Sequence, residues 1–254
     1  MSQGAPAGSF GVPAACGLLC LTMTVVGGAI TRQAPAGGSG EAVGTDTSRA
    51  ARLEVIEVRS KAPGDRLAFF MSGDGGWVVA DRRLADALAS HGVSVLGLDS
   101  RAYLSRKRTP DQVGQDVAGT LEAYLNRWHK AHLVLICSSR GADLMPFVAN
   151  RLPEDLRARI ELIVLLSVSR WANFQFHWQD IFIDTRRPTD VPVLPELERL
   201  RGTRMVCVYG DDDKTSLCSM VDTSLVTPRS RYGGHRLRGD QSAELAELIL
   251  DALP

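Results

Sequence analysis

Short apolar runs alternate with amphipathic stretches from residue 53 to the end of the chain. Four of these runs are apolar almost throughout, which is typical of strands buried on both faces. Two earlier runs, residues 53–58 and 67–72, are interpreted as an initial strand pair. The four buried strands are expected at residues 93–99, 133–137, 161–167 and 205–210.

The stretches between the strands have helical periodicity. The clearest covers residues 110–129, where Thr109 can cap the helix and Pro110 fits its first turn. Because parallel neighbours need crossover connections, the alternation predicts an α/β fold with a mainly parallel sheet and helices on both faces, a three-layer sandwich. Functional sites in such sheets lie at the carboxyl ends of the strands. Further helices are expected at residues 79–90, 141–152, 195–201 and 239–253.

The N-terminal part of the chain has a different character. Residues 11–30 are nearly free of polar side chains and are about long enough to cross a bilayer. Small residues at 27–29 resemble a signal-peptidase site, although no Lys or Arg precedes the apolar run. We therefore expect an exported protein, with residues 1–32 as a signal peptide or membrane anchor. Residues 33–50, rich in Gly, Ala, Ser and Thr, are predicted to be a flexible linker to a folded domain at 51–254.

Charge narrows the range of partners. Lys and Arg together number 29, as do Asp and Glu, and the basic residues are scattered through the predicted helices. A nucleic-acid-binding protein usually carries a basic stripe or patch that follows the phosphate backbone. The sequence therefore argues against nucleic acid as a partner.

One segment departs from the strand and helix rhythm. Residues 168–194 contain aromatic residues, a histidine and acids without a clear period. Two interpretations stay open: a lid or substrate-contacting excursion, and a packed surface hairpin.

A serine stands between a predicted strand and a predicted helix. Residues 137–141, Cys-Ser-Ser-Arg-Gly, fit the nucleophile-elbow pattern except that its first glycine is a cysteine, which is small. Ser139 is the expected nucleophile, since Ser138 would lie one residue too early in the turn. The amide of Arg140, at the helix N-terminus, would face a developing oxyanion. The alternative is a serine that only caps a helix.

A serine nucleophile needs a base and an acid. His235 lies in a glycine-containing loop between the last predicted strand and the final helix, where the base belongs if the triad runs serine, acid, histidine along the chain. The alternative is a loop histidine that caps the final helix. Residues 211–213 are three aspartates at a strand end, and their spacing favours Asp213, with Asp211 and Asp212 left open.

The loop at residues 73–77, Gly-Asp-Gly-Gly-Trp, follows the predicted strand at 67–72. Its glycines would let backbone amides approach a substrate oxygen, so the amide of Asp74 or Gly75 is expected to complete an oxyanion hole with that of Arg140. Trp77 is a candidate contact for the substrate. A phosphate-cradling loop is disfavoured because no Gly-Lys-Ser/Thr follows.

The cysteines divide by context. Cys16 and Cys20 lie in the apolar leader and are treated as leader residues. Cys207 lies in a predicted strand and Cys218 in the following loop, at a separation that a disulfide can close in an oxidising compartment. Such a short loop would contribute roughly 3 kcal/mol. The alternative is two unrelated thiols.

Several blocks of the sequence, read in order, resemble the bacterial virulence protein family of VirJ and AcvB over residues 67–253. They are FFMSGDGGW, DSRAYLSRKRTPDQVGQD, SSRGADLMPFVANRLP, VCVYGDDD and GGHRLRGD. The resemblance implies an α/β-hydrolase fold, a periplasmic location and a serine hydrolase activity on aminoacylated phosphatidylglycerol, chiefly lysyl-phosphatidylglycerol. It also implies a link to virulence and type IV secretion.

The resemblance assigns individual residues as well. The family's serine corresponds to Ser139 and its histidine to His235. Its pair of cysteines, which resembles a disulfide pair, corresponds to Cys207 and Cys218. The family usually has Gly-Tyr-Ser-Phe-Gly at residues 137–141, and a second histidine in place of Arg236. These differences adjoin the catalytic groups and bear on substrate preference and activity.

The leading hypothesis is hydrolysis of the ester between an amino acid and a phosphatidylglycerol headgroup at the membrane surface, with no metal or organic cofactor. A cationic aminoacyl group needs acidic neighbours, for which Asp74, Asp143 and Asp180 are candidates by position. Asp143 has the alternative role of stabilising a helix N-terminus. The competing hypothesis is a catalytically silent periplasmic adaptor that binds secretion-system proteins on the same fold. A general carboxylesterase is a third interpretation.

Overall fold

The computed structural model describes residues 53–181 and 186–254, apart from the side chains of residues 180 and 181. These residues all belong to one compact unit. The predicted leader, anchor and linker lie outside the described residues. Within the described part of the chain, no helix combines the length and apolar character needed to cross a bilayer.

A seven-stranded sheet forms the centre of the fold, in the order β1-β3-β2-β4-β5-β8-β9. All neighbouring strands run parallel except β1, which is antiparallel to β3. The strands of this sheet are β1 Ile56–Val58, β2 Arg66–Met71, β3 Ser94–Leu98, β4 His132–Ser138, β5 Ile160–Leu166, β8 Met205–Gly210 and β9 Thr227–Arg231.

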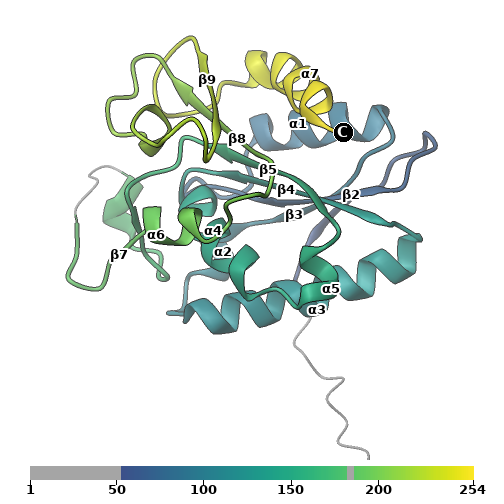
Figure 1. Cartoon of the computed structure of the whole chain (residues 1–254), viewed down its shortest axis with the longest axis horizontal. Coiled ribbons are helices and arrows are strands. Elements are labelled where there is room, and N and C mark those ends of the chain that lie inside the picture. Colours follow the sequence, from purple (N-terminus) through teal and green to yellow (C-terminus); the bar gives the residue numbers. More distant parts are fainter. Residues whose placement is uncertain (1–52, 182–185) are drawn as a thin grey trace, which may run out of the picture. The chain divides into compact units, whose positions relative to one another are not determined.

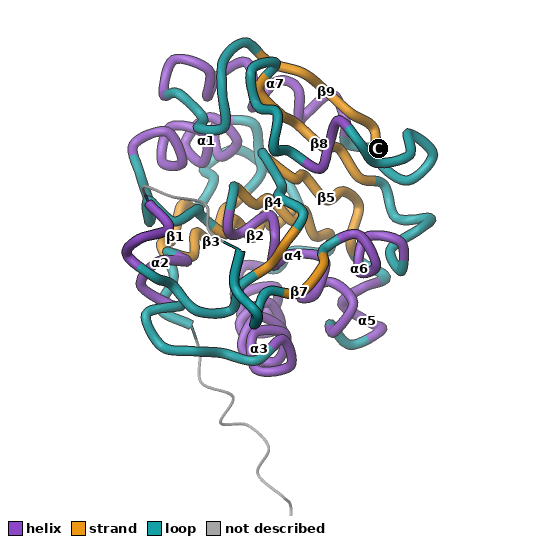
Figure 2. Tube along the Cα trace, turned by 90° about the vertical axis from the view of Figure 1, so that its left-hand side faces the viewer, coloured by secondary structure: helices purple, strands orange, loops and turns teal. Residues whose placement is uncertain are grey.

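Helices cover both faces of the sheet, so the fold is the predicted three-layer α/β sandwich (Figure 1). α1 and α7 lie on one face, and α3 and α4 lie on the other. Figure 2 shows the strands between these two layers from a second direction. The α-helices are α1 Val79–Ser90, α2 Ser100–Tyr103, α3 Pro110–Trp128, α4 Arg140–Arg151, α5 Glu154–Arg157, α6 Leu194–Glu198 and α7 Ser242–Ala252, and the 3₁₀ helices are η1 Trp178–Ile181, η2 Leu217–Ser219 and η3 Gly239–Gln241.

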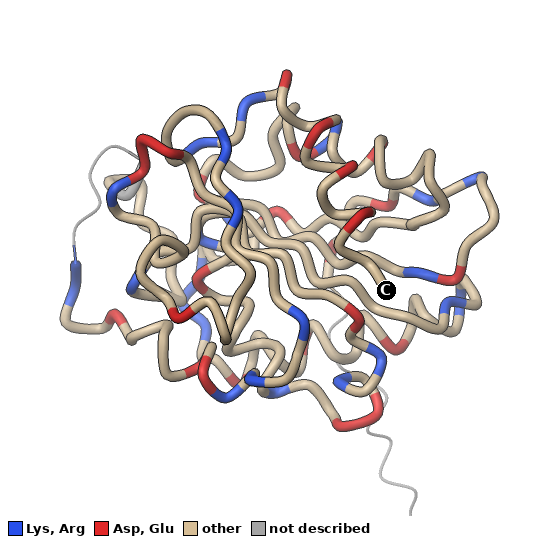
Figure 3. The backbone as a smooth tube through the Cα atoms, turned by 45° about the horizontal axis from the view of Figure 1, so that its top comes forward, with Lys and Arg blue, Asp and Glu red and all other residues tan. Residues whose placement is uncertain are grey.

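Alternate residues of the central strands enter two separate cores. Phe69 and Leu135 pack toward α3 and α4, whereas Phe70 and Ile136 pack toward α1 and α7. All four side chains are fully buried. In Figure 3 the central strands carry few charged residues, and most Lys, Arg, Asp and Glu lie toward the periphery. Burial on both faces explains why the strand sequences are continuously apolar.

The expected strands and the main helices are confirmed, with boundary shifts of a few residues. The initial strand pair is wrong in one respect: β1 and β2 do not pair with each other, because β3 lies between them and pairs with both. β9 was missed because its sequence, Thr-Pro-Arg-Ser-Arg, has no apolar residue and pairs only with β8 at the edge of the sheet.

The irregular segment at 168–194 contains a small antiparallel pair, β6 Trp171–Ala172 with β7 Val191–Pro192. The residues beside β6 pack into the fold: Phe174 is buried and makes an edge-to-face contact with Phe147 of α4. The described part of this segment therefore contains the packed hairpin that was one of the two interpretations offered from the sequence.

Candidate active site

Three loops at the carboxyl edge of the sheet bring together the residues predicted as a triad. Ser139 follows β4, Asp213 follows β8, and His235 follows β9. Oγ of Ser139 lies 2.8 Å from Nε2 of His235, and Nδ1 of His235 lies 2.8 Å from Oδ2 of Asp213. A continuous hydrogen-bonded chain thus runs from serine to carboxylate.

Ser139 occupies the sharp turn between β4 and α4. Its backbone has φ 49° and ψ −117°, a conformation that costs an L-residue energy and is found at functional turns. Its hydroxyl does not cap α4, so the interpretation of Ser139 as a simple helix cap is wrong. The hydroxyl points instead to His235.

The residues that flank Ser139 explain how the elbow fits. A Cβ on Gly141 would clash with the carbonyl oxygen of Met71, so this position has no room for a side chain. Cys137, which replaces the usual first glycine, is fully buried, and its thiol donates to the carbonyl oxygen of Val164 on β5. The cysteine therefore fits at the end of β4 without disturbing the turn.

The imidazole of His235 is held in one tautomer by its partners. A carboxylate can only accept, so Nδ1 carries the proton that is donated to Asp213, and Nε2 is left to accept the proton of Ser139. This is the arrangement that a general base requires. The interpretation of His235 as a cap of the final helix has no support in these contacts.

Asp213 is the aspartate that contacts the histidine. Its Oδ1 accepts hydrogen bonds from the backbone amide and the hydroxyl of Thr215, which leaves Oδ2 for His235. Burial acts to raise the pKa of Asp213, but the hydrogen bonds from Thr215 and the nearby His235 outweigh it and lower the pKa. The carboxyl group is therefore held in its charged form.

Other residues hold the loop that carries His235. The hydroxyl of Ser167, at the end of β5, donates to the carbonyl oxygen of His235 at 2.8 Å. Arg231 donates to the same oxygen at 3.0 Å. Asp211 accepts the backbone amide of Gly233, so this second aspartate positions the loop and does not contact the imidazole. Sequence reasoning missed Ser167 and Arg231, because contacts to a distant carbonyl oxygen leave no local pattern.

The glycine-rich loop after β2 lies beside the nucleophile. A Cβ placed on Gly73 would lie 3.0 Å from Cβ of Ser139. The backbone amide of Gly141 donates to the carbonyl oxygen of Ser72 at 3.1 Å, which fastens the loop to the elbow. The two predicted halves of an oxyanion hole, at Arg140 and at Asp74 or Gly75, therefore come from adjacent segments.

A partly buried ion pair joins these same two segments through their side chains. Nε and Nη2 of Arg140 lie 2.9 and 3.1 Å from Oδ1 and Oδ2 of Asp74. Arg140 also donates to the carbonyl oxygen of Asn173, beside β6. The carboxylate of Asp74, a candidate acid for a cationic substrate, is thus bound to Arg140.

Two further residues assigned to substrate binding also make contacts within the fold. Asp143 is buried in the first turn of α4, where it accepts the backbone amide of Ser169 at 2.6 Å, and burial raises its pKa well above the usual range. The ring of Trp77 packs edge-to-face on Phe70, and a Cβ on Gly97 of β3 would lie 2.5 Å from that ring. Asp180 belongs to η1, and its side chain lies outside what the structure describes.

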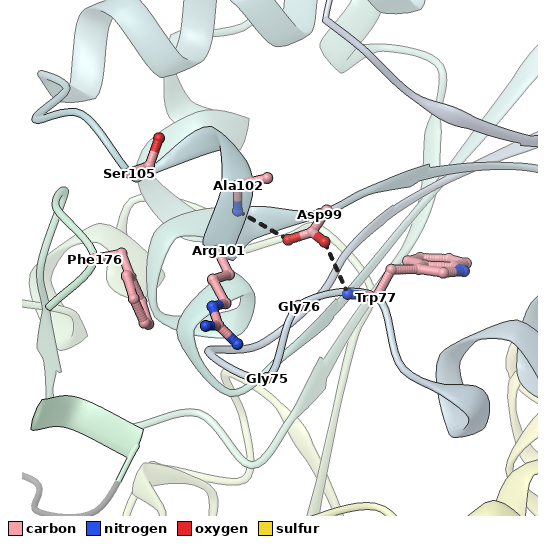
Figure 4. A pocket seen from close by; sticks show the side chains of 8 residues that line it. All are labelled: Gly75, Gly76, Trp77, Asp99, Arg101, Ala102, Ser105 and Phe176. Carbon is pink, nitrogen blue, oxygen red and sulfur yellow. Dashed lines mark hydrogen bonds between the residues drawn. The ribbon is translucent and has the colours of Figure 1, made fainter. Parts of the chain in front are cut away.

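A cavity of about 400 Å³ opens beside the glycine-rich loop (Figure 4). The ring of Trp77 points away from it, and Arg101 and Phe176 project toward it. Its lining residues are Gly75, Gly76, Trp77, Asp99, Arg101, Ala102, Ser105 and Phe176. Arg101 and Phe176 were not among the residues expected to form a site. The feature of the sequence that could have indicated this site is a basic residue, Arg101, just after the predicted strand at 93–99.

A disulfide closes the loop that carries Asp213. Cys207 of β8 and Cys218 of η2 form the bond, with 5.4 Å between their Cα atoms, and both residues are buried. The third described cysteine, Cys137, is a free buried thiol. Across residues 53–181 and 186–254, no three His, Cys, Asp or Glu side chains converge as a metal site would need.

The sequence profile described as Bacterial virulence protein (VirJ) matches residues 65–254. This chain belongs to the VirJ family. A comparison with curated protein sequences gives no match.

Solved structures similar to this VirJ-family chain share its fold at low identity. Est1E from Butyrivibrio proteoclasticus is 12% identical, with a TM-score of 0.56 over 78% of this chain and 92% of that chain. Esterase PE8 is 13% identical, with a TM-score of 0.53 over 80% of this chain and 100% of that chain. A thioesterase domain from the curacin biosynthetic pathway is 15% identical, with a TM-score of 0.52 over 78% and 99%. The VirJ-family domain therefore has the α/β-hydrolase fold.

Proposed function

We propose that this VirJ-family protein is a serine hydrolase that cleaves the aminoacyl ester of lysyl-phosphatidylglycerol or a related aminoacylated lipid. The proposal of a hydrolase rests on the hydrogen-bonded chain from Ser139 through His235 to Asp213 at the carboxyl edge of the sheet. Each of its two hydrogen bonds is 2.8 Å long. The substrate part rests on the resemblance of the sequence blocks to the VirJ family.

In the proposed reaction, Ser139 Oγ attacks the ester carbonyl while its proton passes to Nε2 of His235. The amides of Arg140 and of the loop at 73–76 would receive the charge that develops on the carbonyl oxygen. His235 then gives the proton to the departing glycerol oxygen, which leaves the amino acid esterified to Ser139. A water molecule, deprotonated by His235, attacks this acyl-enzyme and releases the free amino acid.

The fixed tautomer of His235 supports this sequence of proton transfers. Asp213 is charged, so it stabilises the imidazolium that forms when His235 takes the serine proton. This chemistry needs no metal or organic cofactor.

The proposal places the protein in the periplasm, at the membrane surface. The Cys207–Cys218 disulfide supports an oxidising compartment.

The test is release of free lysine from vesicles containing lysyl-phosphatidylglycerol by the purified full-length protein. Ser139→Ala is expected to abolish release. Ser138→Ala, the same change one residue earlier, is the matched control and should retain it. Labelling with a fluorophosphonate probe in parallel reports whether Ser139 is a reactive nucleophile.

The outcomes separate the three hypotheses. Lysine release that requires Ser139 supports the proposal. Labelling and cleavage of p-nitrophenyl acetate without lysine release would overturn the lipid substrate and leave a general carboxylesterase. A folded protein that is neither labelled nor active would overturn the enzyme and favour the adaptor.

A further inference from the structure

The cavity beside the glycine-rich loop carries a positive charge close to the proposed reaction centre. Gly75 and Gly76 form part of its wall, and Gly73 of the same loop lies against Ser139. A substrate whose ester carbonyl lies at Ser139 could therefore extend a substituent past this loop into the cavity. Figure 4 shows the guanidinium of Arg101 directed toward Gly75 and Gly76.

Arg101 is held by an aromatic ring. Its guanidinium carbon lies 5.2 Å from the centre of the Phe176 ring. Among the described side chains, no carboxylate lies within ion-pair distance of Arg101. A cation stacked on a ring in this way keeps its N–H groups available to an anion at the edge of the guanidinium.

The wall opposite the glycine-rich loop is fixed in place. The backbone amide of Phe176 donates to the carbonyl oxygen of Leu104, and that of Arg108 donates to the carbonyl oxygen of Phe174. These bonds join the segment after α2 to the segment after β6. The site is therefore built from two segments that are far apart in the sequence.

Asp99, the acidic residue in the cavity wall, already accepts two backbone hydrogen bonds. Oδ1 of Asp99 accepts the backbone amide of Ala102, and Oδ2 accepts that of Trp77. Its role is to join the start of α2 to the end of the glycine-rich loop.

We propose that this cavity is a subsite for the phosphodiester of the substrate headgroup, with Arg101 as the residue that binds the phosphate oxygens. The proposal rests on the proposed function, because the phosphodiester belongs to the alcohol that leaves when the aminoacyl ester is cleaved. A guanidinium can bind two phosphate oxygens through paired N–H groups. The same positive charge would repel the ammonium groups of a lysyl residue, so the cavity suits the alcohol side of the ester.

A binding experiment tests the subsite without relying on turnover. The Ser139→Ala protein is titrated with glycerophosphoglycerol, the soluble headgroup diester, and separately with inorganic phosphate. Arg101→Gln in this background is expected to weaken binding of the diester about tenfold, the loss of roughly 1.4 kcal/mol. Arg106→Gln removes the same charge from the next exposed arginine, outside the cavity lining, and should change the affinity less than twofold.

A kinetic experiment tests whether Arg101 acts on the phosphate of the substrate. In the active protein, Arg101→Gln should lower kcat/KM for lysyl-phosphatidylglycerol about tenfold and leave lysine ethyl ester, which has no phosphate, unchanged. Arg101→Lys should recover part of the loss because it restores the charge.

The outcomes distinguish failure of this inference from failure of the proposed function. Loss of diester binding in Arg101→Gln, with no lysine release by the unmodified protein, would retain the subsite and reject the lipid hydrolase. Equal effects of Arg101→Gln and Arg106→Gln, or inorganic phosphate binding as tightly as the diester, would overturn the subsite. A higher kcat/KM in Arg101→Gln would assign the cavity to the cationic aminoacyl group and also overturn it.

Discussion

Arg140 and Asp74 form a two-point ion pair across 66 residues of sequence, between the residue after the nucleophile and the loop that borders it. The side chain of Arg140 is 9% exposed and that of Asp74 is 21% exposed. The backbone amide of Arg140, together with that of Asp74 or Gly75, is predicted to meet a developing oxyanion. The ion pair therefore fixes the distance between the two halves of the proposed oxyanion hole.

Removing one partner of this pair should affect both stability and turnover. Arg140→Ala leaves the Asp74 carboxylate largely buried without its cation, which should lower the free energy of unfolding by about 3 kcal/mol. A loop displaced by about 1 Å near the nucleophile should lower kcat by up to about 100-fold. Urea unfolding and steady-state kinetics on p-nitrophenyl acetate measure the two effects.

A double-mutant cycle separates the pair from other roles of Arg140. Arg140→Ala and Asp74→Ala together should cost less than the sum of the single changes, since each single variant leaves one unpaired charge and the double variant leaves none. The exposed pair Arg82–Asp86 on α1 is the matched control, with a coupling of at most about 0.5 kcal/mol expected. Additive losses at Arg140 and Asp74 would show that their contact does not position the loop.

The role of Asp213 can be tested against its neighbour in the sequence. Asp213→Asn presents an amide to His235, which favours the wrong imidazole tautomer, so kcat should fall by about 10⁴-fold. Asp212→Asn is the control, because Asp212 is exposed and its backbone amide, not its carboxylate, contacts the histidine loop. Comparable losses in both variants would mean that loop structure, and not the tautomer, limits the reaction.

Much of the fold was predictable because the signal was local. The buried strands and main helices were found from runs of apolar residues such as 133–137. The choice of strand neighbours was not predictable, because hydrophobic periodicity records which residues are buried and not which strand lies alongside. This is why β3 was not expected between β1 and β2, and why the polar edge strand β9 was missed.

The candidate triad was predictable for a related reason. Ser139, Asp213 and His235 each follow a strand, and the ends of parallel strands meet at one edge of the sheet. The ion pair of Arg140 with Asp74 joins loops that are far apart in the sequence and leaves no local pattern, so this contact was not predicted. Gly97 in the middle of β3 was a usable signal for Trp77, because a strand glycine often marks the close approach of another group.

The disulfide should stabilise the loop that holds the triad acid. Asp213 and Thr215 both lie in the loop closed by Cys207 and Cys218, which are 11 residues apart. Replacing both cysteines with alanine should lower the free energy of unfolding by about 3 kcal/mol from the loss of loop closure. Turnover should also fall, because Asp213 is then less firmly held. Urea unfolding with and without a reductant measures the stability change.

The reductant supplies the control for this prediction. It should destabilise the unmodified protein by a similar amount and leave the double alanine variant unchanged, since the remaining described cysteine, Cys137, is a free thiol. An unmodified protein whose unfolding midpoint is insensitive to reductant would contradict the stabilising role.

Asp81 on α1 should make stability depend on pH in the opposite sense to a usual surface carboxylate. The residue is 3% exposed, and burial raises its pKa from 3.8 to about 6, against the hydrogen bond that it accepts from the Val78 amide and with the added effect of Asp99. Between about pH 4 and 6 the folded protein binds more protons at this site than the unfolded chain. The contribution of Asp81 to stability is therefore fully present below pH 4 and is lost as the pH rises through 6.

Asp81→Asn, which keeps an acceptor for Val78 without the charge, should gain stability relative to the unmodified protein over this interval, by up to about 3 kcal/mol. Urea unfolding at several pH values measures the difference. A flat profile for Asp81→Asn would contradict the raised pKa.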